Sequence, residues 1–381
     1  MHLSENPITF HLGELFCGPG GIAIGAKLAE IPEHPELRIH HAWANDIDPS
    51  TCATYRTNIC PDDPESVLCQ DVHTIDIEKN SFFQAHPFDA FAFGFPCNDF
   101  SLVGKQKGFD GKYGPLYTYG IRILKAYQPK WFLGENVSGL SSANDGHAFQ
   151  QILQDMQDAG YRVYPHLYKF EQYGVPQARH RIIIVGIRDD QTDEDGNPLA
   201  FYPPVPTTPN PEDYKTCKEA IEEPPIPKDA PNHEFMRMNR KVRERLELIG
   251  EGENVFNAKA LQSHPDLLLN VHGARISQLY RRLDSTKPSY TVTGSGGGGT
   301  YVYHYKEPRA LTNRERARLQ TFPDTFIFQG SRQQVRKQIG MAVPCDGVRQ
   351  IFESILKTFG GIPYQHITCN ISLSEKRDAV A

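Results

Sequence analysis

The sequence has few of the features that mark membrane-spanning or secreted proteins. A transmembrane helix needs about 20 consecutive apolar residues, and the longest apolar stretches, such as 88–95 and 182–187, are far shorter. The N-terminal segment shows no basic stretch followed by an apolar run, so no secretory signal is visible. We therefore expect a protein that has no membrane partner and works in the cytoplasm.

Cysteine is sparse, and its spacing argues against two common roles. The 381 residues include eight cysteines, and no two of them form a CxxC pair. This spacing argues against a disulfide framework and against a zinc site, so we expect no metal. Most of the cysteines are expected to be small buried hydrophobic residues, which leaves one or two for chemistry.

An excess of basic residues is absent as well. The formal net charge is −6, whereas a protein that binds a polyanion needs at least one basic face. Basic residues do gather late in the chain, within 237–245, 275–282 and 314–318. Because a basic cluster is more often a solvated surface, these clusters support nucleic-acid binding without establishing it.

The first half of the chain alternates short β-rich segments with helical patterns, which predicts a doubly wound α/β sheet with parallel strands and crossover helices. Strands are expected at 10–16, 38–44, 67–70, 88–94, 130–134, 162–170 and 181–187. Helices are expected near 21–30, 49–58, 116–127 and 147–159.

The pattern changes after Arg188, where acidic residues and then many prolines indicate a linker or a second domain. A glycine-rich loop follows at 294–299, and Thr312 with Glu315 form a capping-box pattern. An amphipathic helix over 348–356 is expected to pack back on the first domain. We expect the tail to fray after Thr368.

A glycine-rich turn follows the first expected strand and opens the first helix, in the segment 15–21. Glycines here let backbone N–H groups and the helix N-terminus approach a ligand. The spacing Gly18-x-Gly20-x-x-Ala23 also fits a dinucleotide fingerprint. A nicotinamide enzyme and a purely structural turn therefore both remain open at this point.

Two aspartates each follow an expected strand, so both are expected at the ligand-binding crevice of the sheet. Asp46 could accept hydrogen bonds from ribose hydroxyls, and Asp71 could accept one from an adenine amino group. The alternative is that each aspartate caps the following helix. Capping is the favoured reading for Asp48, which precedes Pro49.

Cys97 follows Pro96 at the end of the fourth expected strand, and Glu135 begins Glu-Asn-Val at the end of the fifth. A thiolate can add to one carbon of an electron-poor ring while a carboxyl group holds or protonates a ring nitrogen. Gln177-x-Arg179-x-Arg181 then enters the seventh strand, with both arginines expected on one face. Two guanidinium groups beside such a site can hold a base carbonyl, a phosphate or the carboxylate.

These motifs together resemble the DNA cytosine-5 methyltransferase family. The glycine loop, Pro-Cys, Glu-Asn-Val, Gln-x-Arg-x-Arg, a variable region and two closing motifs at 309–320 and 338–344 occur in the family's order. The resemblance implies a class I S-adenosylmethionine-dependent methyltransferase, a Rossmann-like seven-stranded sheet with a smaller target-recognition domain. The expected ranges are 1–200 for the catalytic domain, 201–290 for the recognition domain, 291–365 for the closing motifs and 366–381 for the tail.

The resemblance also implies a mechanism. Cys97 attacks C6 of a cytosine flipped out of duplex DNA, and Glu135, steadied by Asn136, bonds the ring nitrogen and the amino group. Arg179 stabilises the base, and Arg181 helps to hold the glutamate. The methyl group comes from S-adenosylmethionine, with S-adenosylhomocysteine as the product, and 5-methylcytosine is formed.

The same resemblance assigns binding residues. Those expected to line the cofactor pocket are Phe16, Cys17, Gly18, Pro19, Gly20, Gly21, Asp46, Ile47, Asp71, Val72, Pro96, Leu116, Met341, Ala342 and Val343. Those expected to contact DNA are Ser101, Lys105, Lys107, Gln177, Arg237, Arg240 and Arg275. Two departures from the family are Asn98-Asp99 after the cysteine, where relatives have Gln-Ser or Gln-Pro, and Met341, where relatives have Asn.

Several alternatives stay open on the sequence alone. They are a transfer-RNA methyltransferase of the same fold, a binding module without catalysis and, more remotely, a nicotinamide oxidoreductase. The preferred reading is a bacterial or archaeal, nucleoid-associated monomer that methylates double-stranded DNA. It acts either beside a cognate restriction endonuclease or as an orphan enzyme, and the sequence does not reveal the target site.

Overall fold

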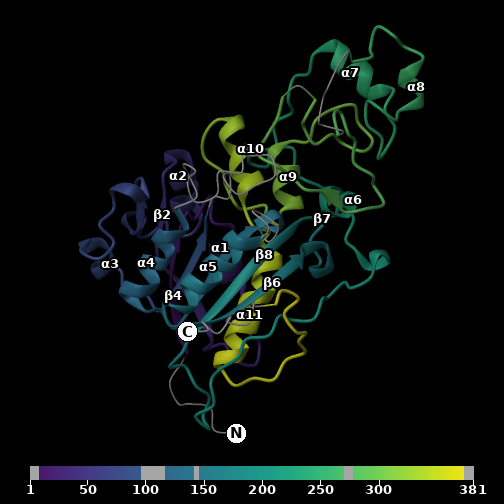
Figure 1. The fold of residues 1–381 in the computed structure, drawn as a ribbon. Coiled ribbons are helices and arrows are strands. Elements are labelled where there is room, and N and C mark those ends of the chain that lie inside the picture. The colour runs from purple at the N-terminus through teal and green to yellow at the C-terminus, as the bar shows by residue number, and fades with distance from the viewer. Residues whose placement is uncertain (1–7, 96–115, 141–145, 270–277, 298, 373–381) are drawn as a thin grey trace. The chain divides into compact units, whose positions relative to one another are not determined.

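The computed structural model describes residues 8–95, 116–140, 146–269, 278–297 and 299–372. The chain divides into two compact units (Figure 1). Unit 1 contains residues 1–169, 180–205 and 348–381, and unit 2 contains residues 170–179 and 206–347.

Unit 1 is built on a seven-stranded sheet in the order β3-β2-β1-β4-β5-β8-β6. Its strands are β1 (Thr9–Leu15), β2 (Arg38–Asp46), β3 (Val67–Cys69), β4 (Ala90–Gly94), β5 (Trp131–Val137), β6 (Tyr161–Lys169) and β8 (His180–Arg188). Each coincides with an expected strand, so the doubly wound α/β fold and its class I methyltransferase topology are confirmed.

The expectation of an entirely parallel sheet is wrong for one strand. Strands β1 to β5 pair in parallel, whereas β8 runs antiparallel to both of its neighbours, β5 and β6. A parallel connection needs a crossover of about a dozen residues or more, usually a helix. The segment 170–179 between β6 and β8 offers only the 3₁₀ turn η6 (Phe170–Tyr173) and the short strand β7 (Gln177–Ala178), so the chain reverses.

Helices flank this sheet, and the four expected ones are confirmed. They are α1 (Gly21–Leu28), α2 (Pro49–Asn58), α4 (Tyr117–Tyr127) and α5 (His147–Gln157). A fifth helix, α3 (Ser81–Ala85), was not expected, because five residues are too few to show a helical period. The C-terminal helix is α11 (Cys345–Phe359).

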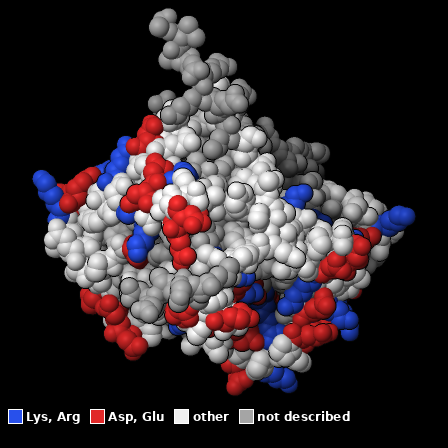
Figure 2. Space-filling view, turned by 90° about the horizontal axis from the view of Figure 1, so that it is seen from below, with Lys and Arg blue, Asp and Glu red and all other residues white. Residues whose placement is uncertain are grey.

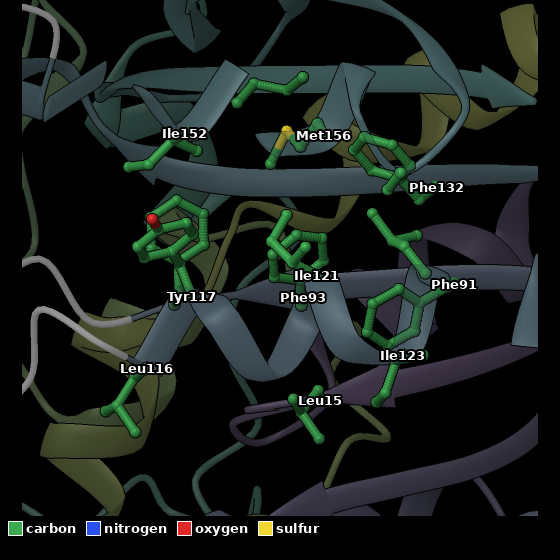
Figure 3. Packing of buried hydrophobic residues seen from close by; sticks show 14 of the residues in the cluster. Leu15, Phe91, Phe93, Leu116, Tyr117, Ile121, Ile123, Phe132, Ile152 and Met156 are labelled. Carbon is green, nitrogen blue, oxygen red and sulfur yellow. The ribbon is translucent and has the colours of Figure 1, made fainter. Parts of the chain in front are cut away.

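One face of the sheet is covered by α4 and α5. Phe91 and Phe93 of β4 and Phe132 of β5 project toward Ile121 of α4 and Met156 of α5, and all five are buried (Figure 3). On the opposite face, Phe10 and Trp131 pack against aromatic side chains of α11. Side chains alternate between these two faces along β4 and β5, and this alternation fixes the register of the strands. The register in turn decides which residues lie at the end of the sheet where the functional groups gather.

The described part of unit 2 has little regular structure. Its elements are β7 and β9 (Ser289–Tyr290), which pair in parallel, and α6 (Cys217–Glu222), α7 (Arg240–Glu247), α8 (Lys259–Gln262), α9 (Asn313–Leu319) and α10 (Arg332–Met341). Two 3₁₀ turns, η1 (Pro64–Ser66) and η2 (Val72–Thr74), belong to unit 1, and η7 (Pro211–Asp213) belongs to unit 2.

Capping and buried arginines stabilise unit 2. The expected capping box at Thr312 and Glu315 is present at the start of α9. Arg282 is buried and donates to the carbonyl groups of Leu246, Ile249, His304 and Tyr305. Such bonds satisfy backbone acceptors that sheet and helix ladders leave open.

The expected fraying of the tail after Thr368 is wrong up to residue 372. Asn370 accepts a hydrogen bond from the backbone N–H of Leu167 and donates one to its carbonyl group. The amide side chain thereby pairs with backbone groups on the free edge of β6. The periodicity of the sequence gives no sign of this contact.

The surface carries charges of both signs. On the face shown in Figure 2, basic and acidic side chains lie interspersed. Within the part of the chain that the structure describes, no helix is long and apolar enough to cross a membrane.

Candidate active site

The glycine loop joins β1 to α1 through a tight backbone path. Phe16, Gly18 and Gly20 have φ of 57°, 56° and 98°. A side chain on Gly20 would lie only 3.1–3.3 Å from Tyr55 and Ile59. The start of α1 has no side-chain cap, which suits a loop that presents backbone N–H groups to a ligand.

Asp46 ties this loop to the end of β2. Its carboxylate accepts the N–H of Gly18 at 3.0 Å and that of Asp48 at 2.9 Å. Burial raises the pKa of Asp46, and these two N–H groups act in the opposite direction. The next residue, Ile47, is 64% exposed, so an apolar side chain lies open beside a carboxylate.

The capping alternative holds for Asp71 and Asp48. Asp71 caps η2, accepting the backbone N–H of His73 at 3.0 Å and contacting the His73 ring at 2.7 Å. Asp48 caps α2 by accepting the N–H groups of Ser50 and Thr51. The Asp71 side chain is 44% exposed, which leaves room for a further hydrogen bond.

The expected catalytic glutamate lies at the end of β5, paired in register with Gly94 of β4. Its carboxylate forms an ion pair with Arg181 at 2.8 Å, and the two side chains are only 14% and 13% exposed. A Cβ added to Gly94 would lie 3.2 Å from Oε2 of Glu135. The carboxylate therefore lies directly over the last residues of β4.

Asn136 stabilises the backbone at the same end of the sheet. It is buried, and its Nδ2 donates to the carbonyl oxygen of Phe95 at 3.1 Å. This bond fixes the backbone just before Pro96 and Cys97, which lie outside the described residues, as do Ser101, Lys105, Lys107 and Arg275. The structure thus brings Glu135, Asn136 and Arg181 together beside the chain that leads to the expected nucleophile.

The motif Gln177-x-Arg179-x-Arg181 divides between the units. Arg181 belongs to β8, whereas Arg179 lies between β7 and β8, so the two arginines do not share one face of a single strand as expected. Arg179 is 1% exposed and donates to the carbonyl groups of Val292 and Gly340, each at 3.1 Å. Gln177 is buried as well and bonds to Val292 N–H and Gln320.

The remaining expected residues vary in exposure. Val72 and Leu116 of unit 1 and Ala342 and Val343 of unit 2 are buried, and Met341 is 59% exposed. Arg237 is exposed, and Arg240 pairs with Glu244 at 2.7 Å on the surface of α7. Among the described residues, no cluster of three His, Cys, Asp or Glu side chains could hold a metal ion.

A buried polar chain beneath the glycine loop was not expected from the sequence. Glu14 is 1% exposed and accepts a hydrogen bond from Tyr55 at 3.0 Å, and Tyr55 contacts His41. Burial raises the pKa of Glu14 to about 8 and lowers that of His41 to about 4. The only available signal was an acidic residue inside an apolar strand directly before the loop.

The seven-stranded sheet, together with Glu135, Asn136 and Arg181 at the end of β5 and the start of β8, defines a methyltransferase of class I. A family model of the C-5 cytosine-specific DNA methylases matches residues 10–357. The chain belongs to this family, and it is an enzyme of the DNA (cytosine-5-)-methyltransferase type, as its motifs predicted.

Individual relatives agree with the family match. The chain is 57% identical over 368 residues to the Type II methyltransferase M.BbvI of Brevibacillus brevis, covering 94% of each chain. It is 40% identical over 369 residues to M.NgoFVII of Neisseria gonorrhoeae, covering 96% of this chain and 91% of the relative. A solved structure of a DNA modification methyltransferase encoded within an Escherichia coli prophage has a TM-score of 0.66 at 21% identity. That match covers 91% of this chain and 98% of the other, and it supports the fold.

Proposed function

We propose that this enzyme transfers the methyl group of S-adenosylmethionine to C5 of a cytosine within a short duplex DNA sequence, as the modification enzyme of a restriction–modification system. The observation that carries the proposal is the partly buried pair of Glu135 and Arg181, 2.8 Å apart beside the chain leading to Cys97. The names of the relatives, Type II methyltransferases, support the biological setting.

The residues at the glycine loop fit the proposed cofactor. Gly18 has open space where a side chain would stand, the Asp46 carboxylate can accept from ribose hydroxyls, and the exposed side chain of Ile47 can cover an adenine face. S-adenosylmethionine supplies an electrophilic methyl group on its sulfonium sulfur.

The chain's own residues prepare the cytosine. Cys97 adds as a thiolate to C6, which moves electron density to C5, while Glu135 holds N3 and the amino group. Arg181 keeps the glutamate in position through the ion pair. After methylation, loss of the C5 proton expels the thiolate and restores the ring. Taking the base out of the helix costs a few kcal/mol, which DNA contacts must offset.

We assign the DNA contacts to Ser101, Lys105, Lys107, Arg237, Arg240 and Arg275. Gln177, which was also expected to contact DNA, is buried and bonded to Val292 and Gln320, so we assign it to the internal packing of unit 2 instead. The enzyme is proposed to act as a monomer in the cytoplasm, at the nucleoid, with a restriction endonuclease of the same specificity as its partner.

Sequencing of genomic DNA for 5-methylcytosine tests this function. Cells express the wild-type chain, Cys97→Ala or the control Cys69→Ala, which alters an exposed cysteine outside the Pro-Cys motif. We expect one short motif to be methylated with wild type and Cys69→Ala and unmethylated with Cys97→Ala. DNA without a methylated motif in all three samples would contradict the proposal, and transfer RNA would then be the substrate to examine.

A further inference from the structure

Two cysteines of unit 1 lie close to the backbone of Asp46. Cys52 of α2 is 0% exposed, and its thiol donates to the carbonyl oxygen of Asp46 at 3.4 Å. Cys69 is exposed and is the last residue of β3, where it pairs in register with Asp46 of β2. The N–H of the next residue, Gln70, donates to the same carbonyl oxygen at 3.1 Å. Both cysteines therefore lie beside one peptide oxygen.

The packing of α2 on β3 also places the two cysteines at the same level. Arg56 of α2 donates to the carbonyl oxygen of Val67, the first residue of β3, at 2.6 Å. Because β2 and β3 are parallel, the helix that connects them runs antiparallel to both. The step from Arg56 back to Cys52 covers about 6 Å along a helix, and the step from Val67 to Cys69 covers about 6.6 Å along a strand. The contact of Arg56 with Val67 thus brings Cys52 next to Cys69.

The two thiols interact, and they differ in their access to solvent. Burial raises the pKa of Cys52, the Cys69 thiol raises it further, and the charge of Arg56 acts in the opposite direction. Both are free thiols in the described part of the chain. An exposed thiol can react with an oxidant from solvent, and a second thiol beside it can then displace the product to form a disulfide.

We propose that Cys52 and Cys69 form a reversible disulfide on exposure to a peroxide, and that this bond weakens the binding of the methyl donor. The Cys69 thiolate attacks one oxygen of hydrogen peroxide, the O–O bond breaks, and a sulfenic acid and hydroxide result. The sulfur of Cys52 then attacks the sulfur of Cys69, and the S–O bond breaks as the S–S bond forms. The two thiol protons leave in water, so two thiols and one peroxide give one disulfide and two waters. A dithiol reductant reverses the bond by exchange.

The effect on the methyl donor follows from the position of Asp46, and this part of the inference rests on the proposed function. The Asp46 carboxylate holds the N–H of Gly18 at 3.0 Å and is assigned to the ribose hydroxyls. In the disulfide, Cys52 has lost the proton that it donates to the carbonyl oxygen of Asp46. Loss of one hydrogen bond changes an equilibrium constant by about two- to tenfold. We therefore expect the Kd for S-adenosylmethionine to rise by about this factor on oxidation.

The test follows the disulfide and the affinity separately. Reduced wild type, Cys69→Ala and the control Cys369→Ala, which removes a partly exposed cysteine elsewhere, are treated with hydrogen peroxide and then with dithiothreitol. Peptide mass spectrometry should find Cys52 linked to Cys69 in wild type and in the control, and free again after reduction. Calorimetry should show the higher Kd for S-adenosylmethionine in these two oxidised proteins and no change in Cys69→Ala. Binding is measured instead of methyl transfer, so that oxidation of the proposed nucleophile Cys97 does not decide the result.

The outcomes separate this inference from the function on which part of it rests. Oxidation of Cys69 in wild type to a sulfinic acid, or to a disulfide with a second chain, would overturn the pair. A disulfide between Cys52 and Cys69 that leaves the Kd unchanged would overturn its effect on the methyl donor, as would an equal rise of Kd in oxidised Cys69→Ala. If reduced wild type does not bind S-adenosylmethionine, the proposed function fails and the effect fails with it, whereas the disulfide stands or falls by mass spectrometry alone.

Discussion

Glu14 shows how burial changes the chemistry of a single residue. It lies in β1 directly before the glycine loop, and its Oε1 has no partner among the described residues. Because burial raises its pKa from 4.5 to about 8, the folded protein holds this carboxyl group protonated at neutral pH. In the unfolded chain the group ionises near its ordinary pKa, so the folded state loses stability as the pH rises from about 4.5 to about 8.

Substituting this residue should remove that pH dependence. We expect Glu14→Gln, which can still accept from Tyr55, to be more stable than wild type by about 1–3 kcal/mol above pH 8 and by much less near pH 4.5. Urea unfolding of both proteins between pH 4.5 and pH 8 measures the difference between their free energies of unfolding. The contributions of the other titrating groups cancel in this difference. A difference that does not change with pH would show that Glu14 ionises normally in the fold.

Glu135 should be essential for the reaction. Glu135→Gln keeps the shape of the side chain but cannot donate or hold a proton as the acid does, so we expect kcat to fall by about 10²–10⁴-fold. Arg181→Lys should lower kcat less, because the charge near Glu135 remains while the geometry of the guanidinium is lost. Methyl transfer to duplex DNA is the measurement, and the exposed Glu65→Gln serves as control. Activity of Glu135→Gln within tenfold of wild type would contradict this role.

Among the secondary-structure elements, helix α10 packs tightly against the backbone of the glycine-rich loop that begins at Gly294. A Cβ added to Gly340 would lie 2.0 Å from the backbone nitrogen of Gly294, whereas one added to Gly139 would meet nothing within 4 Å. We expect Gly340→Ala to lower the free energy of unfolding by about 1–3 kcal/mol or more, and Gly139→Ala to change it little. Thermal and urea unfolding of both variants measure this difference in stability. Equal stabilities would contradict the prediction, because the backbone at Gly294 would then move aside without loss of free energy.

The elements of the sheet could be predicted because each strand and each of its longer helices carries its own periodic pattern. The direction of β8 could not be predicted, because the apolar pattern of a buried strand is the same in both directions. Only the connection from β6 determines whether the strand runs parallel or antiparallel. The capping box at Thr312 was predictable from two residues, whereas the edge contact of Asn370 with Leu167 joins residues far apart in the chain. Local patterns therefore give the elements, and long-range connections give their arrangement.

On the scale of the whole molecule, the cysteines divide into protected and accessible groups. Cys17, Cys52, Cys60, Cys217 and Cys345 are buried, and Cys69 is exposed. Burial also raises the pKa of each of these five thiols. We expect an alkylating reagent near neutral pH to modify Cys69 and to spare the five until guanidinium unfolds the protein. Peptide mass spectrometry reads the outcome, and native labelling of Cys217 or Cys345 as fast as Cys69 would contradict it.

The site was predictable where residues form a known motif and not where their partners are backbone groups. Glu135, Asn136 and Arg181 were assigned together from the sequence, and the structure brings them together. Arg316 was noted only as a member of the basic cluster at 314–318, and Arg336 was not singled out, because the partners of both are carbonyl groups that any residue can supply. The types of side chain in the sequence cannot show which backbone groups such arginines bond.

Unit 2 is assembled from two stretches of chain, 170–179 and 206–347. A protein engineer who transplants only the longer stretch from a relative would leave Gln177 and Arg179 of the host facing foreign partners at Val292, Gln320 and Gly340. A hybrid enzyme that carries unit 2 of a relative therefore needs four splice junctions rather than two, so that the short stretch is exchanged together with the long one.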